Sequence, residues 1–80
     1  MQAIFILVKC ELGTAYAVAA EMVDSIEQIS EVYSISGQYD LLVKCYLPKD
    51  HDIGHFVTGV VQTLPHIKDT QTIITFNAFS

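Results

Sequence analysis

The residues best suited to bind a small polar molecule are Gly-Gln-Tyr-Asp at residues 37–40. Gly37 permits backbone conformations closed to other residues, so the N–H groups around it could hold a carboxylate. Asp40 could accept hydrogen bonds from an ammonium group, and the Tyr39 ring could form the wall of a pocket. A free amino acid carries both of these charged groups.

A turn explains the same segment without any ligand. Gly37 is a common turn residue, and Asp40 can hydrogen-bond to its neighbouring backbone in a turn. Tyr39 can simply pack against the fold. On the residues alone both interpretations stay open, and the turn is the simpler one.

Two histidines, His51 and His55, stand four residues apart with Asp50 and Asp52 beside them. On a helix this spacing places both imidazoles on one face, as two metal ligands require. No third ligand is evident, since His66 lies at the far end of the same expected helix. Solvated histidines and helix-capping aspartates explain the pattern as well. We therefore predict no metal and no other cofactor.

The two cysteines, Cys10 and Cys45, fall on strands expected to be antiparallel neighbours. They are expected to be about five residues out of register, on the order of 15 Å, which is beyond disulfide reach. Neither has a histidine beside it. We predict that both are small buried apolar residues.

The charge of the chain argues against nucleic acid as a direct partner. The formal net charge is −5, there is no arginine, and the four lysines are scattered. Binding to nucleic acid depends on clustered Lys and Arg, and an anionic membrane calls for a basic amphipathic segment. No targeting signal is visible either, so a cytoplasmic location is expected.

Length and composition predict one small domain that associates with other chains. Residues 1–80 are enough for a single domain. Apolar residues make up 51% and charged residues only 16%, against about 25% charged in a typical soluble domain. The excess apolar surface is most simply covered by a second copy of the chain.

The hydrophobic pattern alternates between strand and helix periods. We expect strands at 2–10, 31–36, 41–47 and 69–79. A helix after Gly13, with Thr14 as its N-cap, carries apolar residues at spacings of three and four. A second helix is capped by Asp50 or Asp52 and ended by Pro65. The order is the α+β, ferredoxin-like β-α-β-β-α-β, with both helices on one face of a four-stranded antiparallel sheet. The apolar faces expected for the two helices are Ala15, Val18, Ala19, Met22, Val23, Ile26 and Ile29, then Ile53, Phe56, Val57, Val60, Val61 and Leu64.

The sheet face without helices should also be apolar. A sheet with one wet face normally alternates apolar and polar residues, but the first and third strands are apolar on both sides. We assign Lys9 and Lys44 to the face without helices. That face would then present an apolar group that we predict to be a dimer interface, with two-fold symmetry: Phe5, Leu7, Leu42 and Tyr46.

The same topology gathers the candidate binding residues. The end of the first strand, the hairpin at 37–40 and the start of the last strand share one end of the sheet. This arrangement brings Glu11 and the hydroxyls of Thr70 and Thr72 towards the hairpin. Ordinary strand propensity also explains the two threonines. The complete ligand-binding set we predict is Gly37, Gln38, Tyr39, Asp40, Thr70 and Thr72.

The segment Val-Tyr-Ser-Ile-Ser-Gly-Gln-Tyr-Asp-Leu at 32–41 resembles the hairpin of the Lrp/AsnC ligand-binding (RAM) domain. The resemblance includes the opening apolar strand, Leu64-Pro65, and Thr70-Gln71-Thr72. It implies an amino-acid-responsive domain that dimerises through its sheet, assembles into rings of dimers and binds ligand near the hairpin. It favours ligand binding over a bare turn for Gly37, Tyr39 and Asp40, and less so for Gln38 and the threonines.

Full-length regulators of that family carry a helix-turn-helix before this domain, and we expect this chain to lack one. It is similar to the stand-alone versions, so a link to transcription is expected to need a full-length Lrp/AsnC-type partner. The alternative is a small enzyme, since two ferredoxin-like units can close into a dimeric α/β barrel such as a monooxygenase or isomerase. Its polar groups at the sheet centre would be Lys9, Lys44 and Asn77. No catalytic triad, phosphate-binding glycine loop or carboxylate pair is present, so we predict no enzyme activity.

Overall fold

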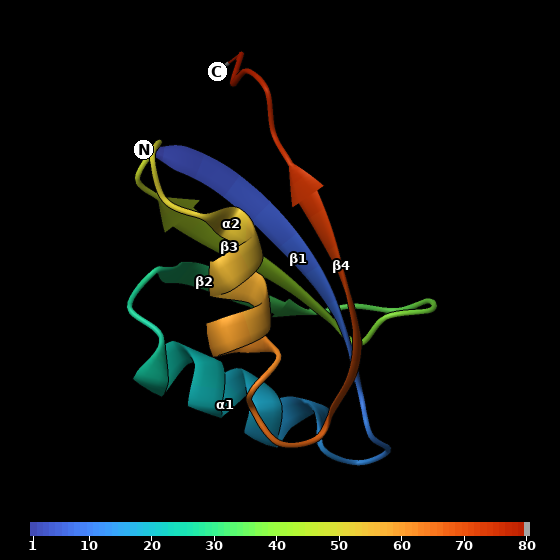
Figure 1. The fold of residues 1–80 in the computed structure, drawn as a ribbon. Coiled ribbons are helices and arrows are strands. Elements are labelled where there is room, and N and C mark those ends of the chain that lie inside the picture. The colour runs from blue at the N-terminus through green and yellow to red at the C-terminus, as the bar shows by residue number, and fades with distance from the viewer. Residues whose placement is uncertain (80) are drawn as a thin grey trace.

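The computed structural model describes residues 1–79, so only the last residue of the predicted 1–80 domain lies outside it. Four strands form one antiparallel sheet in the order β2-β3-β1-β4. Both helical segments cover the same face of this sheet (Figure 1). The ferredoxin-like α+β prediction is therefore confirmed. The elements in chain order are β1 (Gln2–Cys10), α1 (Ala15–Ser25), β2 (Ile29–Ser34), β3 (Leu41–Leu47), α2 (Ile53–Phe56), η1 (Val57–Val61) and β4 (Ile67–Ile74).

The core lies between the helices and one face of the sheet. Alternate residues of β1 and β3 point into it, and every one of them from Ile4 onwards is buried. Cys10 and Cys45 are among them, and both are free thiols. Cys45 lies opposite Ile4, six positions along β1 from Cys10. Burial raises the pKa of the Cys45 thiol to about 11, which keeps it neutral in the core.

The first helix, α1, packs through one stripe. Val18, Met22 and Ile26 are buried at a spacing of four residues, which keeps them on one side of the helix. Val23 was predicted for this face but is exposed. It directly follows Met22 in the sequence, so it lies beside the buried stripe and not within it. Thr14 stands at the N-cap position, but its hydroxyl donates to Glu11 O at 2.7 Å and does not cap the helix.

The second helical segment differs from the regular helix that was predicted. Asp52 is the N-cap, accepting from the His55 N–H at 3.0 Å. After α2 the chain continues as the π-helical η1, in which Gln62 N donates to Val57 O five residues back. The wider turn leaves Val60 exposed while Val57 and Val61 stay buried. This helical segment ends at Val61, four residues before Pro65.

The bounds predicted for β1 and β3 are confirmed, whereas those for β2 and β4 were wrong. Because β3 starts at Leu41, which pairs with Ser34, β2 has no partner beyond Ser34. The strand runs from Ile29 to Ser34, whereas 31–36 was predicted. The last strand was expected at 69–79 but runs from Ile67 to Ile74. Its ladder with β1 ends at the pair Ile4–Ile74, beyond which β1 is nearly exhausted.

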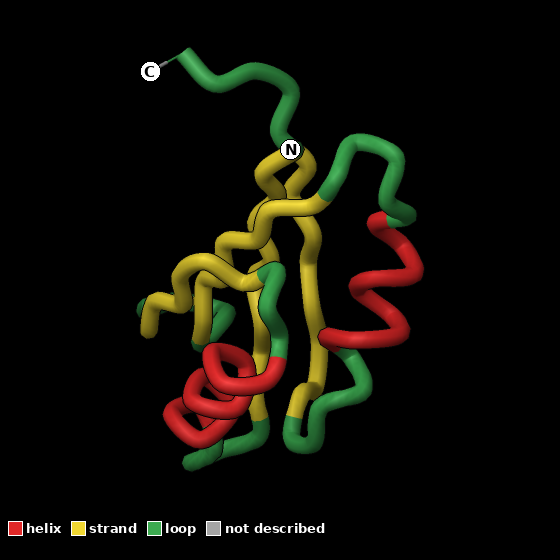
Figure 2. The backbone as a smooth tube through the Cα atoms, turned by 90° about the vertical axis from the view of Figure 1, so that its left-hand side faces the viewer, coloured by secondary structure: helices red, strands yellow, loops and turns green. Residues whose placement is uncertain are grey.

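Residues 75–79 therefore form a tail outside the sheet. Figures 1 and 2 show it leaving the body beyond the end of β4. Two hydrogen bonds fix its root: Thr75 Oγ1 donates to Ala3 O at 2.5 Å, and Gln2 Nε2 donates to Thr75 O at 3.1 Å. Asn77 lies in this tail and not in the centre of the sheet, where the enzyme alternative required it.

The opposite face of the sheet has no helical cover among the described residues, and we call it the uncovered face. Lys9 and Lys44 lie there, as predicted, since they alternate with buried neighbours. The four residues predicted for a dimer interface lie on it as well. Lys44 Nζ sits 5.2 Å from the centroid of the Tyr46 ring, a cation–π contact that keeps the charge beside the apolar group.

Candidate functional site

The predicted meeting of three segments at one end of the sheet is confirmed by hydrogen bonds. Asp40 N donates to Val8 O at 2.9 Å, and Cys10 N donates to Asp40 Oδ2 at 2.7 Å. The Asp40 carboxylate is thus attached to the last residue of β1. Burial and the Asp40 charge together raise the pKa of the Cys10 thiol, so this cysteine is kept protonated.

The hairpin loop is held over the uncovered face. In the view of Figure 1 the loop reaches across β1 and beyond β4. Lys9 Nζ donates to Gln38 O at 3.0 Å, and Tyr39 Oη donates to Gln71 Oε1 at 3.3 Å. Gly37 has φ +107°, which side-chain-bearing residues rarely adopt, with open space where a Cβ would stand. The loop backbone at Gly37 is therefore accessible.

The two threonines of the predicted set lie on the other side of β4. Thr70 pairs with Val8 and Thr72 with Ile6, so both share the face that the helices cover. Thr70 Oγ1 accepts from Gln62 Nε2 at 2.7 Å. Gln71, between them, is the β4 residue that reaches the hairpin. Gln71 was missed from the sequence, because the face of each β4 residue depends on the β1–β4 register.

A hollow of about 500 Å³ opens beside Asp40, between the end of β1 and the start of α1. Its volume lies within the range of small-molecule pockets. Leu12 and Tyr16 supply an apolar wall, and charges of both signs surround it. The lining residues are Lys9, Cys10, Glu11, Leu12, Gly13, Ala15, Tyr16, Asp40 and Lys68. Of these, the sequence analysis assigned Asp40 to the ligand and brought Glu11 to this end of the sheet.

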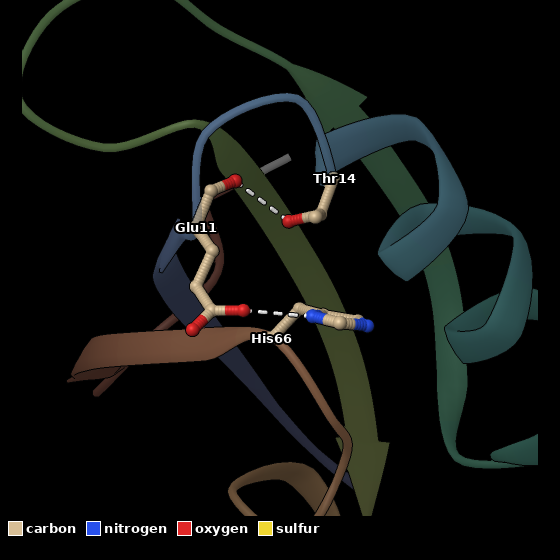
Figure 3. A network of polar contacts seen from close by, with 3 residues as sticks. All are labelled: Glu11, Thr14 and His66. Carbon is tan, nitrogen blue, oxygen red and sulfur yellow. Dashed lines mark hydrogen bonds and ion pairs between the residues drawn. The ribbon is translucent and has the colours of Figure 1, made fainter.

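A small polar network braces one side of this hollow (Figure 3). His66 Nδ1 and Glu11 Oε1 are 2.7 Å apart, and Glu11 N donates to His66 O at 2.9 Å. The Thr14 hydroxyl bonds the Glu11 carbonyl from the other direction. His66 has φ 72°, a left-handed conformation that few residues other than glycine adopt. The network ties the turn after β1 to the start of β4.

Comparison with known proteins identifies the family. Residues 3–80 match the family model described as the Lrp/AsnC ligand binding domain. The chain belongs to this family. It is 34% identical over 70 residues to the HTH-type transcriptional regulator FL11 of Pyrococcus abyssi, and those residues are 88% of this chain and 45% of the relative. The chain thus spans about half the length of the curated relatives it matches.

Solved structures of this fold differ in how much of their length the domain occupies. TTHA0845 of Thermus thermophilus superimposes with a TM-score of 0.89 at 26% identity, covering 100% of this chain and 99% of that one. AsnC of E. coli gives a TM-score of 0.85 at 22% identity, covering 99% of this chain but 53% of AsnC. The second match shows the ferredoxin-like fold of the Lrp/AsnC domain within a longer chain.

The histidine pair lies well away from this end of the sheet, at the start of α2. Both His51 and His55 are exposed, and the His51 ring stands edge-on to Phe56 with centroids 6.4 Å apart. The backbone N–H of His55 holds the pKa of Asp52 below its usual value, as expected for a helix cap. Among residues 1–79 no group of three or more His, Cys, Asp or Glu is placed to hold a metal. No helix in that range is long and apolar enough to cross a membrane.

Proposed function

We propose that residues 1–80 form a single effector-binding domain that takes up an amino acid or a similar small molecule and couples binding to assembly. Membership of the Lrp/AsnC ligand-binding family and the relation to transcriptional regulators support a regulatory role. The observation that carries the proposal is the hollow of about 500 Å³ beside Asp40, with charges of both signs.

The charged groups suit a zwitterion. Asp40 Oδ2 is held by Cys10 N, which orients the carboxylate and leaves Oδ1 to accept from a ligand ammonium. Lys68 lines the same hollow and forms no ion pair with any residue of 1–79. In this proposal Lys68 faces the carboxylate of the ligand, and Leu12 and Tyr16 contact the side chain of the ligand.

The hairpin provides the second part of the proposed site. The N–H groups at Gly37 and Gln38 are offered to the ligand, and Tyr39 forms a wall whose position is set by Gln71. Thr70 and Thr72 belong to the proposed set but lie on the covered side of β4. We therefore expect their removal to weaken binding less than removal of Asp40.

The uncovered face is proposed as the surface through which the domain dimerises. Phe5, Leu7, Leu42 and Tyr46 form an apolar group there, and such groups normally mark an interface. Dimers then assemble into a ring, and a ligand that prefers one assembly shifts the equilibrium towards it.

Coupling to transcription is proposed to occur through a full-length Lrp/AsnC-type regulator that shares the same sheet interface. The net charge of −5 makes direct DNA binding by these residues unfavourable, so the partner supplies the DNA contact. The module acts in the cytoplasm, because it must share a compartment with that regulator. It has no catalytic role in this proposal. Failure to co-purify with such a regulator, with and without amino acids, would count against the coupling.

Thermal denaturation of the purified protein with each standard amino acid at millimolar concentration tests the binding proposal. A ligand at one hundred times its dissociation constant stabilises the native state by about 2.7 kcal/mol, a clear shift of the melting temperature for a small domain. We expect one or a few selective ligands.

Asp40→Asn is the matched variant, because an amide oxygen still accepts from Cys10 N while the charge is removed. The ligand-induced shift should vanish in Asp40→Asn while the melting temperature without ligand stays near that of the wild type. Binding that persists unchanged in Asp40→Asn would exclude the proposed ammonium site.

A further inference from the structure

The tail at residues 75–79 carries two large apolar side chains that are almost fully exposed. Phe76 and Phe79 are each 96% exposed. Figures 1 and 2 show the tail standing clear of the sheet. Exposed aromatic side chains that gather at one place on a surface mark a contact with another molecule.

A groove of about 770 Å³ lies at the root of the same tail. Phe76 and Asn77 line it on the side of the tail, and Phe5 and Tyr46 are among the residues that line the rest. Two lysines, Lys44 and Lys49, line it as well. Phe5 and Tyr46 also belong to the uncovered face, so the groove continues the apolar surface proposed for dimerisation. The two hydrogen bonds at Thr75 fix the direction of the tail, which makes the tail a wall of its own groove.

We propose that the tail of one chain occupies the groove of a second copy, with Phe76 and Phe79 packing against its Phe5 and Tyr46. Tail and groove lie on the same rim of each chain, so a two-fold axis that brings rim to rim satisfies both tails at once. Five extended residues reach about 17 Å, enough to cross from one sheet to the facing one, since packed sheets are about 10 Å apart. This inference rests on the proposed pairing of the uncovered faces.

The same exchange accounts for the composition of the tail. Residues 75–79 read Thr-Phe-Asn-Ala-Phe, which has the β-branched and aromatic residues of a strand. In a single chain β1 extends only two residues beyond the Ile4–Ile74 pair, to Gln2, so most of the tail has no strand beside it. A second copy supplies the surface that this sequence lacks.

The double variant Phe76→Ala/Phe79→Ala tests the inference by sedimentation equilibrium. We expect its dimer dissociation constant to rise tenfold or more, with an unchanged circular dichroism spectrum. The matched control is Val23→Ala/Val60→Ala, which also shortens two exposed apolar side chains but on the helical layer. The control should dimerise as the wild type does. An equal dissociation constant in both variants would overturn the tail exchange.

A tryptophan in the tail separates exchange from packing within one chain. The sequence contains no tryptophan, so Phe79→Trp gives a single reporter. Exchange predicts blue-shifted emission in the dimer that moves to the water-exposed wavelength on dilution. Emission that is blue-shifted at every concentration means packing on the same chain, and water-exposed emission in the dimer means no contact; either result excludes the exchange.

These measurements also distinguish this inference from the proposed function. If the wild type is monomeric at every concentration, the pairing of uncovered faces and the tail exchange fail together. If the wild type dimerises and the tail variants change nothing, only the exchange fails. Amino-acid binding is measured independently, by the loss of the thermal shift in Asp40→Asn.

Discussion

On the covered face of the sheet Ile4, Ile6 and Val8 have no exposed surface, whereas Phe5 and Leu7, their neighbours along β1, are only partly buried. Both faces of β1 are apolar, and the strand has the same backbone on both sides. The difference is that α1, α2 and η1 cover one face, whereas no helical segment of residues 1–79 covers the other. The covered face thus holds the single chain together, while the uncovered face is available to a second chain.

Two adjacent residues give the largest test of this difference. Ile6→Ala should lower the free energy of unfolding by about 2–5 kcal/mol, because it opens a cavity in the core. Leu7→Ala should lower it by less when the protein is dilute enough to be monomeric. Urea denaturation of both variants checks the pair. Equal losses in dilute protein would mean that the two faces contribute alike to the single chain.

A charge on the uncovered face should separate assembly from folding. Leu7→Lys places an ammonium group in the proposed interface, and we expect the dimer to dissociate at least tenfold more readily. Val23→Lys adds the same charge on the exposed side of α1 and should leave the dimer intact. Sedimentation velocity reports assembly and circular dichroism reports the fold. Unfolding of Leu7→Lys in dilute protein would show that this face also supports the single chain.

The hairpin connects the two faces, because Asp40 bonds Cys10 of the core while Lys9 of the uncovered face bonds Gln38. Asp40→Ala should cost about 1–3 kcal/mol of stability, since the Cys10 N–H loses its partner. Asp40→Asn and Lys68→Gln should keep the stability but lose the amino-acid response. Chemical denaturation measures the first effect and thermal shift the second. A stable Asp40→Ala variant would argue against the structural role of this carboxylate.

The smallest expected effect concerns the core thiol Cys45. Its pKa is raised from an ordinary value of 9.0 to about 11 by burial, so the unfolded chain loses this proton at lower pH than the folded one. Stability should therefore be intact below pH 9 and fall as the pH rises from 9 towards 11. Cys45→Ala should show a shallower fall over that window in urea denaturation, although it starts less stable. An identical pH profile in the two proteins would contradict the assignment of Cys45 to the covered face.

The sequence predicts the elements whose boundaries depend on local residues. The apolar runs of β1 and β3 end at turn residues or Pro48, and these limits were predicted correctly. Asp52, which caps the second helical segment, was one of two predicted caps, with Asp50 the other. The ends of β2 and β4 depend on where a partner strand stops, which a single segment does not encode. The π-helical turn at 57–61 was likewise not predicted, because the apolar spacing there also fits a regular α-helix.

The site was predictable to a similar degree. Topology alone brings residues 37–40, the end of β1 and the start of β4 together, as found. The face on which each β4 side chain lies depends on the β1–β4 register, which shifts between Lys9 and Cys10. For that reason Thr70 and Thr72 were placed beside the hairpin, and Gln71 was missed. Tyr16 and Lys68 line the hollow from segments distant in sequence, so no local motif marks them.

The central claim is that binding at the Asp40 end of the sheet is coupled to assembly of the uncovered faces. Sedimentation velocity of the wild type and Asp40→Asn, with each standard amino acid supplied separately at millimolar concentration, tests it most directly. The account predicts that at least one amino acid changes the oligomer distribution of the wild type and that Asp40→Asn does not respond to it. A distribution that stays the same with every amino acid, or an Asp40→Asn variant that responds like the wild type, would contradict the account.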